Sequence, residues 1–140
     1  SEICIPIKYK NFVMIGYVHA MHSTRLDSNS YNTFKLVASS IIKDVHTSGV
    51  FEESKENCPV VEINATTVKF LHPPTRLASR IFSMGGSIIF DLISKSGHRK
   101  FLRASVKAIK PTQKDYAISC DFTLNSPEEV SGLEEFLKKI

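Results

Sequence analysis

The chain of 140 residues is long enough for one domain, or for one domain with a short extension. Its 42% apolar and 23% charged residues are typical of a globular protein and exclude an intrinsically disordered one. No stretch approaches 18 uninterrupted apolar residues, which argues against membrane insertion. Residues 1–10 lack the layout of a signal peptide, and Ser1 in first place predicts a processed chain or a piece of a longer one.

The three cysteines, Cys4, Cys58 and Cys120, are few, odd in number and far apart. This spacing argues against a disulfide framework and indicates a reducing compartment, so we expect a cytoplasmic protein. Cys120 belongs to an apolar strand pattern, and we expect it to pack in the core.

The net charge of +4 is unevenly distributed along the chain. Residues 1–68 carry six Lys/Arg and seven Asp/Glu, residues 69–114 carry ten and one, and residues 115–140 carry two and six. A basic block such as 69–114 attracts phosphates, nucleic acids or acidic proteins. Strands also use lysine for solubility and edge protection, and folding can place the acidic C-terminus beside the block.

The first residues predict a β-hairpin. Ile3, Ile5 and Ile7 alternate with other residues at the period of a strand. Residues 10–11 (Lys-Asn) are suited to a turn. The nearly all-apolar stretch 12–21 predicts a second strand that is covered on both faces.

A helix is predicted after this hairpin. Ser30 is the expected N-cap of a helix from Tyr31 to Thr47, and Gly49 is well placed to end it. Its expected apolar face consists of Phe34, Val37, Ile41 and Val45.

Residues 50–58 predict a linker, and a strand period begins beyond it. His72-Pro73-Pro74 cannot continue a central strand, and residues 75–84 predict a loop or a short basic helix before Gly85-Gly86. The expected strands are 60–64, 67–71, one around 88–92, one around 102–108 and one around 116–122. The short connections 95–98 and 111–114 predict antiparallel hairpins.

The strand around 102–108 separates its residues into two faces. Leu102, Ala104, Val106 and Ala108 form the expected core face, and Arg103, Ser105 and Lys107 lie opposite. Lys95, Arg99 and Lys100 at the hairpin end of this strand are expected to extend a basic patch.

The C-terminal residues predict a capped helix. Ser126 is a suitable N-cap, Pro127 suits the first helical position and Glu129 completes a capping box. The expected apolar stripe is Val130, Leu133, Phe136, Leu137 and Ile140. The predicted fold class is therefore α+β, mainly β: residues 59–140 form a small antiparallel β-barrel with a C-terminal helix, preceded by a β-hairpin plus helix in residues 1–50.

This C-terminal order resembles a PilZ domain. Residues 62–70 resemble the strand turn Asp-x-Ser-x-x-Gly of that family, and 102–122 with 127–140 resemble its closing hairpin and helix. The resemblance implies a six-stranded antiparallel barrel and, in many members, a bacterial receptor for cyclic di-GMP. The family's Asp, Ser and Gly fall at Glu62, Asn64 and Thr67, so this turn departs from the motif.

The arginine pair that the PilZ resemblance implies is also missing from its expected position. The resemblance implies an Arg-x-x-x-Arg before the turn, but residues 40–61 contain no arginine. An Arg-x-x-x-Arg does occur at Arg76 and Arg80, downstream of the turn. Since guanidinium groups clamp phosphates and stack on bases, the module resembles a degenerate PilZ domain.

Residues 4–20, with the helix that follows, are similar to the last hairpin and helix of GAF-type sensory domains. Fifty residues are too few for such a domain, which makes this segment a remnant or an extension that packs on the barrel.

Other chemistry has little support in the sequence. His19 and His22 form His-x-x-His, but no further ligand follows at zinc spacing, so neither a metal nor a cofactor is expected. No nucleophile motif such as Gly-x-Ser-x-Gly and no phosphate loop occurs, which argues against an enzyme.

Three functions remain as hypotheses. The first is a non-catalytic PilZ-like regulatory module that acts through contacts with a protein partner or as a homodimer. The second is a cyclic di-GMP receptor that uses unusual arginines. The third, with less support because aromatic residues do not interleave with the basic ones, is a small barrel that binds nucleic acid. The candidate ligand-binding residues are Arg76, Arg80, Arg99, Arg103, Lys107, Glu62 and Asn64.

Overall fold

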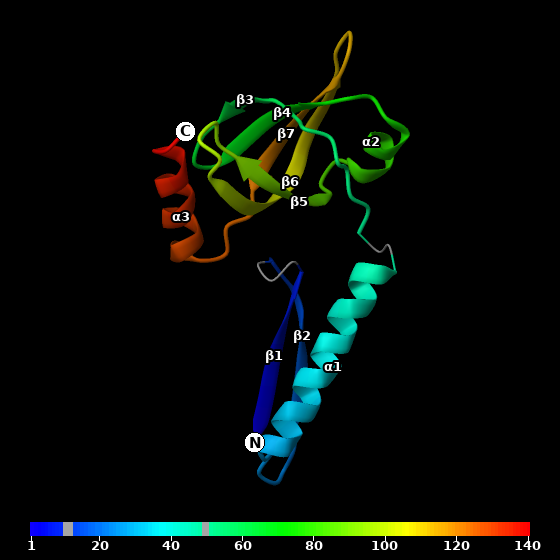
Figure 1. Ribbon diagram of the computed structural model, residues 1–140, viewed down its shortest axis with the longest axis vertical. Helices are drawn as coiled ribbons and strands as arrows, with labels where there is room; N and C mark the ends of the chain where they lie inside the picture. The colour runs from blue at the N-terminus through cyan, green and yellow to red at the C-terminus, as the bar shows by residue number, and fades with distance from the viewer. Residues whose placement is uncertain (10–12, 49–50) are drawn as a thin grey trace. The chain divides into compact units, whose positions relative to one another are not determined.

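The computed structural model of the chain describes residues 1–9, 13–48 and 51–140. These residues form two compact units, Ser1–Glu52 and Glu53–Ile140, which we call unit 1 and unit 2 (Figure 1). We describe each unit by itself.

Unit 1 is a β-hairpin covered by one helix. Strands β1 (Glu2–Tyr9) and β2 (Val13–Met21) pair antiparallel, and α1 (Ser28–Thr47) packs on one face of this pair. Ile5 and Ile7 are buried against Ala38 of α1, which confirms the predicted alternation. The turn predicted at residues 10–11 lies outside the described residues.

The prediction that the second strand is covered on both faces was wrong. Met14, Tyr17 and Met21 of β2 are 58%, 64% and 71% exposed. Since α1 covers a single face of a two-stranded sheet, the other face of β2 stays exposed. The register shift opposite Ile7 and Lys8 exchanges the faces of β2, so Met14 and Tyr17 are both exposed.

Helix α1 begins and packs differently from the prediction. Its N-cap is Asp27 and not Ser30, because the Asp27 carboxylate accepts hydrogen bonds of 2.8 Å from both the backbone N–H and the hydroxyl of Ser30. These bonds favour the ionised carboxylate and lower the pKa of Asp27, so this cap weakens when acid protonates it.

The packed stripe of α1 is Phe34, Ala38 and Ile42. Val37 and Ile41, which were expected on this face, are 44% and 37% exposed. The sequence pattern misled because Ala38, the buried centre of the stripe, is small and contributes little to a count of large apolar residues. Ser48 caps the helix C-terminus, and the predicted stop at Gly49 lies outside the described residues.

Unit 2 contains a five-stranded antiparallel sheet in the order β3-β4-β7-β6-β5. The strands are β3 (Val60–Ile63), β4 (Thr67–His72), β5 (Ser87–Ile93), β6 (Arg99–Pro111) and β7 (Tyr116–Phe122). The predicted barrel was wrong, because within the described residues no ladder joins β3 to β5 and the sheet stays open. β3 has only four residues and an irregular register, which leaves too little regular edge for closure.

The core of unit 2 lies on the inner face of this sheet. Ala104, Ile118 and Cys120 have 0% exposure, and Val68 and Val106 have 2%. The predicted core face of β6 holds for Leu102, Ala104 and Val106, and Cys120 packs in the core as expected.

Ala108 does not continue this face. The register shifts after Val106, which pairs with Cys120, so that Ala108 pairs with Ser119 and Ile109 pairs with Ile118. Lys107 is the additional residue of a β-bulge, and such an insertion exchanges the faces of the residues beyond it. Ile109 therefore packs against the core in place of Ala108.

Two helices lie at opposite ends of the sheet (Figure 1). Helix α2 (Arg76–Ile81), capped by Thr75, is the predicted short basic helix. Helix α3 (Pro127–Leu137) has the predicted N-cap, because Ser126 Oγ accepts from the Glu129 N–H. The Glu129 carboxylate accepts from the N–H of Asn125, the residue before the N-cap, at 2.6 Å, and not from Ser126 as in a capping box. None of the helices in the described part of the chain is long and apolar enough to cross a membrane.

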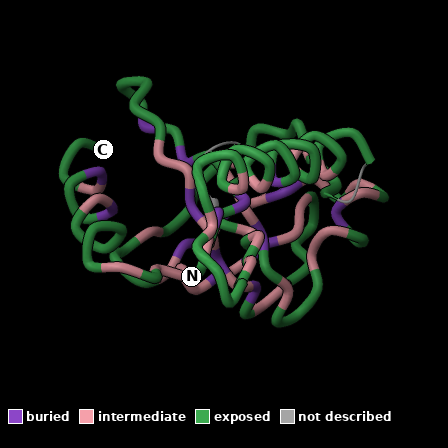
Figure 2. Tube along the Cα trace, turned by 90° about the horizontal axis from the view of Figure 1, so that it is seen from below, coloured by how far each residue is buried: buried purple, intermediate pink, exposed green. Residues whose placement is uncertain are grey.

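Helix α3 packs through the middle of its predicted stripe (Figure 2). Leu133 and Phe136 are buried against Leu92 and Leu102 of the sheet, and Leu137 packs beside them. The two ends of the predicted stripe, Val130 and Ile140, are 39% and 57% exposed. α3 ends at Leu137, so Ile140 lies outside the helix and does not continue its stripe.

We predict that Leu133→Ala destabilises unit 2 by about 2–5 kcal/mol, because it leaves a cavity between α3 and the sheet. Val130→Ala, one turn away on an exposed position, is the matched control and should change stability by less than about 0.5 kcal/mol. Urea denaturation of both variants measures the difference. Equal stabilities of the two variants would show that α3 is not docked.

Candidate functional site

The outer face of the unit 2 sheet carries rows of polar residues that pair across the strands. In one row Thr67 pairs with Asp121, which pairs with Ser105, which pairs with Ser87. The neighbouring residues Glu62, Lys69 and Ser119 pair in the same way across β3, β4 and β7. Since the alternate residues form the core, this polar face is the exposed side of the same strands.

A shallow depression of about 220 Å³ lies in this face. Its lining consists of Glu62, Thr67, Val68, Lys69, Lys107, Ser119, Cys120 and Asp121. It holds two carboxylates and two ammonium groups, so its formal charge is zero. Lys107 Nζ lies 3.5 Å from Asp121 Oδ1, and both side chains remain well exposed to solvent.

The turn beside this depression is held by Asn64. Its Oδ1 accepts hydrogen bonds from the Thr66 N–H at 2.8 Å, the Thr66 hydroxyl at 3.0 Å and the Thr67 N–H at 2.8 Å. The Asn64 N–H in turn donates to the Thr67 carbonyl at 3.0 Å. The predicted ligand residue Asn64 thus holds the turn, with its amide oxygen occupied by local backbone and hydroxyl groups.

The structure brings only some of the predicted site residues together. Glu62 and Lys107 line the depression and Asn64 adjoins it. Arg76 and Arg80 belong to α2, which follows the other end of β4 (Figure 1). The six residues of β4 span roughly 17 Å between these two places, so one small ligand cannot meet all of these groups.

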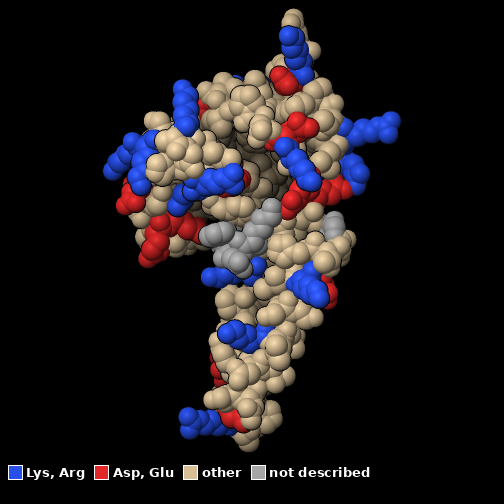
Figure 3. Space-filling model, viewed as in Figure 1, with Lys and Arg blue, Asp and Glu red and all other residues tan. Residues whose placement is uncertain are grey.

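The basic block is spread over unit 2 and interspersed with acidic residues (Figure 3). Arg99 forms an ion pair of 3.1 Å with Asp91. The Lys100 side chain lies directly over Gly132 of α3, a helix that carries four glutamates. Arg99 and Lys110 stand near opposite ends of β6, roughly 35 Å apart at strand spacing, so the basic block extends along the whole strand.

Arg103 differs from these basic residues. It is half-buried on the outer face of β6, directly across from Ile89 of β5. Among the described residues its guanidinium has no ion-pair or hydrogen-bond partner, whereas its backbone carbonyl accepts from the Thr123 N–H at 2.8 Å. A partly desolvated cation without a counter-charge favours an external anion.

Sequence analysis missed four polar residues of the depression, namely Thr67, Lys69, Ser119 and Asp121. Their polar alternation along two strands was a signal that each faces outward. The pairing of β4 with β7 brings them together across 50 residues of chain, and no local pattern predicts that register.

Another residue that sequence analysis passed over is buried His72. Its Nδ1–H donates to the Pro73 carbonyl at 2.7 Å, and its Nε2 accepts from the Ser54 hydroxyl at 2.8 Å. The His72 ring also makes an edge-to-face contact with the Phe82 ring, with the two ring centroids 5.1 Å apart. His72 therefore ties the segment before β3 to the sheet, which is a structural role.

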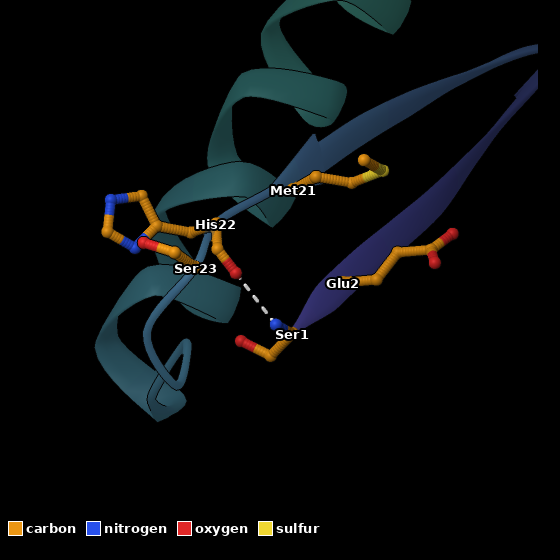
Figure 4. A pocket seen from close by; sticks show the side chains of 5 residues that line it. All are labelled: Ser1, Glu2, Met21, His22 and Ser23. Atoms are coloured by element: carbon orange, nitrogen blue, oxygen red, sulfur yellow. Dashed lines mark hydrogen bonds between the residues drawn. The ribbon is translucent and has the colours of Figure 1, made fainter.

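Unit 1 has a wider hollow of about 530 Å³ at the open end of its hairpin (Figure 4). The side chains of Glu2, His22 and Met21 point in different directions there, and the Ser1 ammonium donates to the His22 carbonyl at 2.7 Å. This hollow holds no convergent set of chemical groups.

The His-x-x-His pair is also divided between separate partners. His19 Nε2 lies 2.8 Å from Glu2 Oε1, and His22 Nδ1 lies 2.7 Å from the Thr24 hydroxyl. Over residues 1–9, 13–48 and 51–140, no group of three His, Cys, Asp or Glu residues is arranged to hold a metal ion.

Comparison of the chain with protein-family models, curated proteins and solved structures finds no significant match. The function is therefore argued from the geometry of unit 2.

The three free cysteines differ in burial and provide a test of the fold. Burial raises the pKa of Cys120 to about 11 and also raises that of Cys58, where the charges of Glu56 and Asp115 add to the effect. Cys4 is exposed on β1. Since the thiolate is the reactive form, a raised pKa and a closed environment both slow modification.

We predict that Ellman's reagent at pH 7.5 modifies Cys4 first, Cys58 more slowly and Cys120 only after unfolding. Absorbance of the released thiolate gives the phases, and Cys4→Ser should remove the fast phase alone. A fast phase that survives in Cys4→Ser, or complete modification of the native protein, would contradict the described packing.

Proposed function

We propose that unit 2 is a non-catalytic, PilZ-like regulatory module that acts through protein contacts and binds cyclic di-GMP weakly or not at all. Its antiparallel strands followed by a C-terminal helix have the order that the sequence resemblance implies. The observation that carries the proposal is the separation of Arg76 and Arg80 from the turn at Asn64, together with the zero net charge of the depression.

Electrostatics make the depression a poor site for a dinucleotide. Cyclic di-GMP carries two phosphates, and its recognition calls for guanidinium groups that clamp phosphate and stack on guanine. The depression contains no arginine, and Glu62 and Asp121 would repel a phosphate there. Lys107 is already beside Asp121, which weakens its field further.

The same depression gives no support for nucleophilic catalysis. A serine hydroxyl or a cysteine thiol becomes a strong nucleophile only when a base lies next to it. Ser119 and Cys120 are the two candidates in the lining, and none of the five histidines of the chain lines it. Burial also raises the pKa of Cys120, which lowers its fraction of thiolate.

Binding of nucleic acid finds little support in the arrangement of charge. A polyanion requires a continuous basic track, often with aromatic platforms for single strands. Here the ion pairs Arg99–Asp91 and Lys107–Asp121 interrupt the basic residues of the outer face. An outer face of mixed charge with only a shallow depression fits a protein surface better.

We predict that cyclic di-GMP binds with a dissociation constant above about 10 μM, which is weaker than about −7 kcal/mol. Isothermal titration calorimetry at physiological ionic strength measures it. The matched variant carries Arg76→Ala and Arg80→Ala and should behave like the parent. A submicromolar constant that this variant loses would instead establish the second hypothesis, a receptor with displaced arginines.

We also predict that Arg103→Glu with Lys107→Glu leaves the protein folded, because Lys107 is exposed and the half-buried Arg103 lies on the outer face. The change removes the Lys107–Asp121 pair, worth about 0–1 kcal/mol, but no core packing. Ala104→Glu, between them in sequence but with 0% exposure, is the control and should prevent folding. Thermal unfolding followed by circular dichroism separates the two. Loss of folding in the double variant would show that this face is buried by other parts of the protein.

A further inference from the structure

Strand β5 forms a free edge of the unit 2 sheet. The Val106 N–H donates to the Gly86 carbonyl at 2.9 Å, and the Ser94 N–H donates to the His98 carbonyl at 2.8 Å, so both ends of the β5–β6 ladder are hydrogen-bonded pairs. In an antiparallel ladder such pairs alternate with non-bonded ones. The backbone groups of Ser87, Ile89, Asp91 and Ile93 therefore point away from β6, and β5 has no other neighbouring strand in the described sheet.

The opposite edge strand is protected and β5 is not. β3 has four residues, follows Pro59 and has an irregular register between Val60 and Glu62. Short, irregular edges of this kind resist the addition of a further strand. β5 instead pairs with β6 in unbroken register over seven residues and contains no proline and no glycine.

The side chains beside this edge combine apolar and basic groups. Ile89 and Ile93 flank Asp91 on the outer face, and Ile93 is 50% exposed. On β6, Arg103 lies across from Ile89 and Arg99 lies across from Ile93. Asp91 neutralises Arg99 at 3.1 Å, which leaves Arg103 as the uncompensated positive charge.

We propose that β5 binds an extended acidic peptide by strand addition, with alternate apolar side chains on Ile89 and Ile93 and a carboxylate on Arg103. This inference rests on the proposed function and specifies its partner. An added strand lies about 4.8 Å from β5 and about 9.6 Å from β6. Arg103 and a glutamate of the added strand both have long side chains. When they lean toward each other above β5, they can span the distance between the two strands and form a charge-assisted pair.

The charges at the edge disfavour two other occupants. A second copy paired antiparallel through β5 would bring together two edges that each carry a net positive charge from Arg99, Arg103 and Asp91, whereas an acidic peptide brings the opposite charge. A nucleic acid would use the arginines but would leave the backbone groups of β5 without partners. An acidic peptide satisfies both the charge and the backbone.

The experiment uses the full chain and a fluorescein-labelled peptide of repeated Glu-Thr-Val-Thr, called the Glu-Val peptide, followed by fluorescence polarisation. Glu and Val share one face of this peptide, so Val can lie on Ile89 and Ile93 while Glu lies diagonal to Arg103. In the Lys-Val peptide, Lys replaces each Glu. We expect saturable binding below 1 mM. A Lys-Val peptide of the same length should bind at least tenfold more weakly. A Glu-Val peptide that is N-methylated at every second residue, on the edge facing β5, should lose at least tenfold because it cannot complete the ladder.

Matched variants locate the site. Arg103→Gln should weaken binding about tenfold, whereas Lys110→Gln, near the far end of the same strand, should have no effect. Ile93→Glu should also weaken binding, whereas Val61→Glu on the opposite edge should not. Both replaced apolar residues are at least half exposed, and circular dichroism verifies that each variant is folded.

The proposal is overturned if the peptide does not bind at concentrations up to 1 mM, or if N-methylation or Arg103→Gln leaves its binding unchanged. It is also overturned if an oligothymidylate at equal charge concentration displaces the peptide from the protein. None of these results bears on cyclic di-GMP, whose titration tests the proposed function separately. A module that excludes cyclic di-GMP and yet fails to bind the peptide would retain its proposed function with a partner of another kind.

Discussion

The pairing of β6 with β7 is the interaction on which unit 2 depends. Ala104 of β6 and Ile118 and Cys120 of β7 have no exposed surface, and every other strand is added outward from this pair. Burial of these side chains fixes which face of each strand is apolar, because side chains alternate at a period of exactly two residues in a ladder. The polar outer face is therefore a consequence of core packing, and its residues are held at fixed spacing by the strands.

A single additional residue in this pair shapes both faces. At Lys107 the bulge lets Ile109 replace Ala108 in the core, and it places the Lys107 ammonium beside Asp121 of β7. Bulges bend a strand and increase its twist, which is how a sheet becomes hollowed on one side. The shallow depression lies at this bulge. Loss of the additional residue would shift the register of the rest of β6 and remove the depression and part of the core together.

Local features of the sequence predicted much of this structure, and contacts between distant residues account for most of the differences. The N-cap at Ser126 depends on four consecutive residues, so the sequence was enough to predict it. The packed face of α1 around Ala38 depends on which side of the helix meets the hairpin, and large apolar residues alone misplaced it. Closure of the sheet and the gathering of Lys69 and Asp121 in one depression depend on strand register, which has no local signal.

An open sheet has two edges, whereas a closed barrel has none, so the failure of closure changes what the surface can do. The chain protects one edge with a short, irregular β3 and leaves the other, β5, with one charged side chain, Asp91. A charge on an edge strand normally opposes pairing with any further chain. Here Arg99 compensates that carboxylate at 3.1 Å, so its repulsion toward an acidic chain is weakened. Arg103, one strand further in, adds attraction for the same kind of chain. Two identical edges, by contrast, would repel each other through the net positive charge that Arg103 leaves beside each of them. In the proposed strand addition, charge therefore distinguishes between a second copy and an acidic partner.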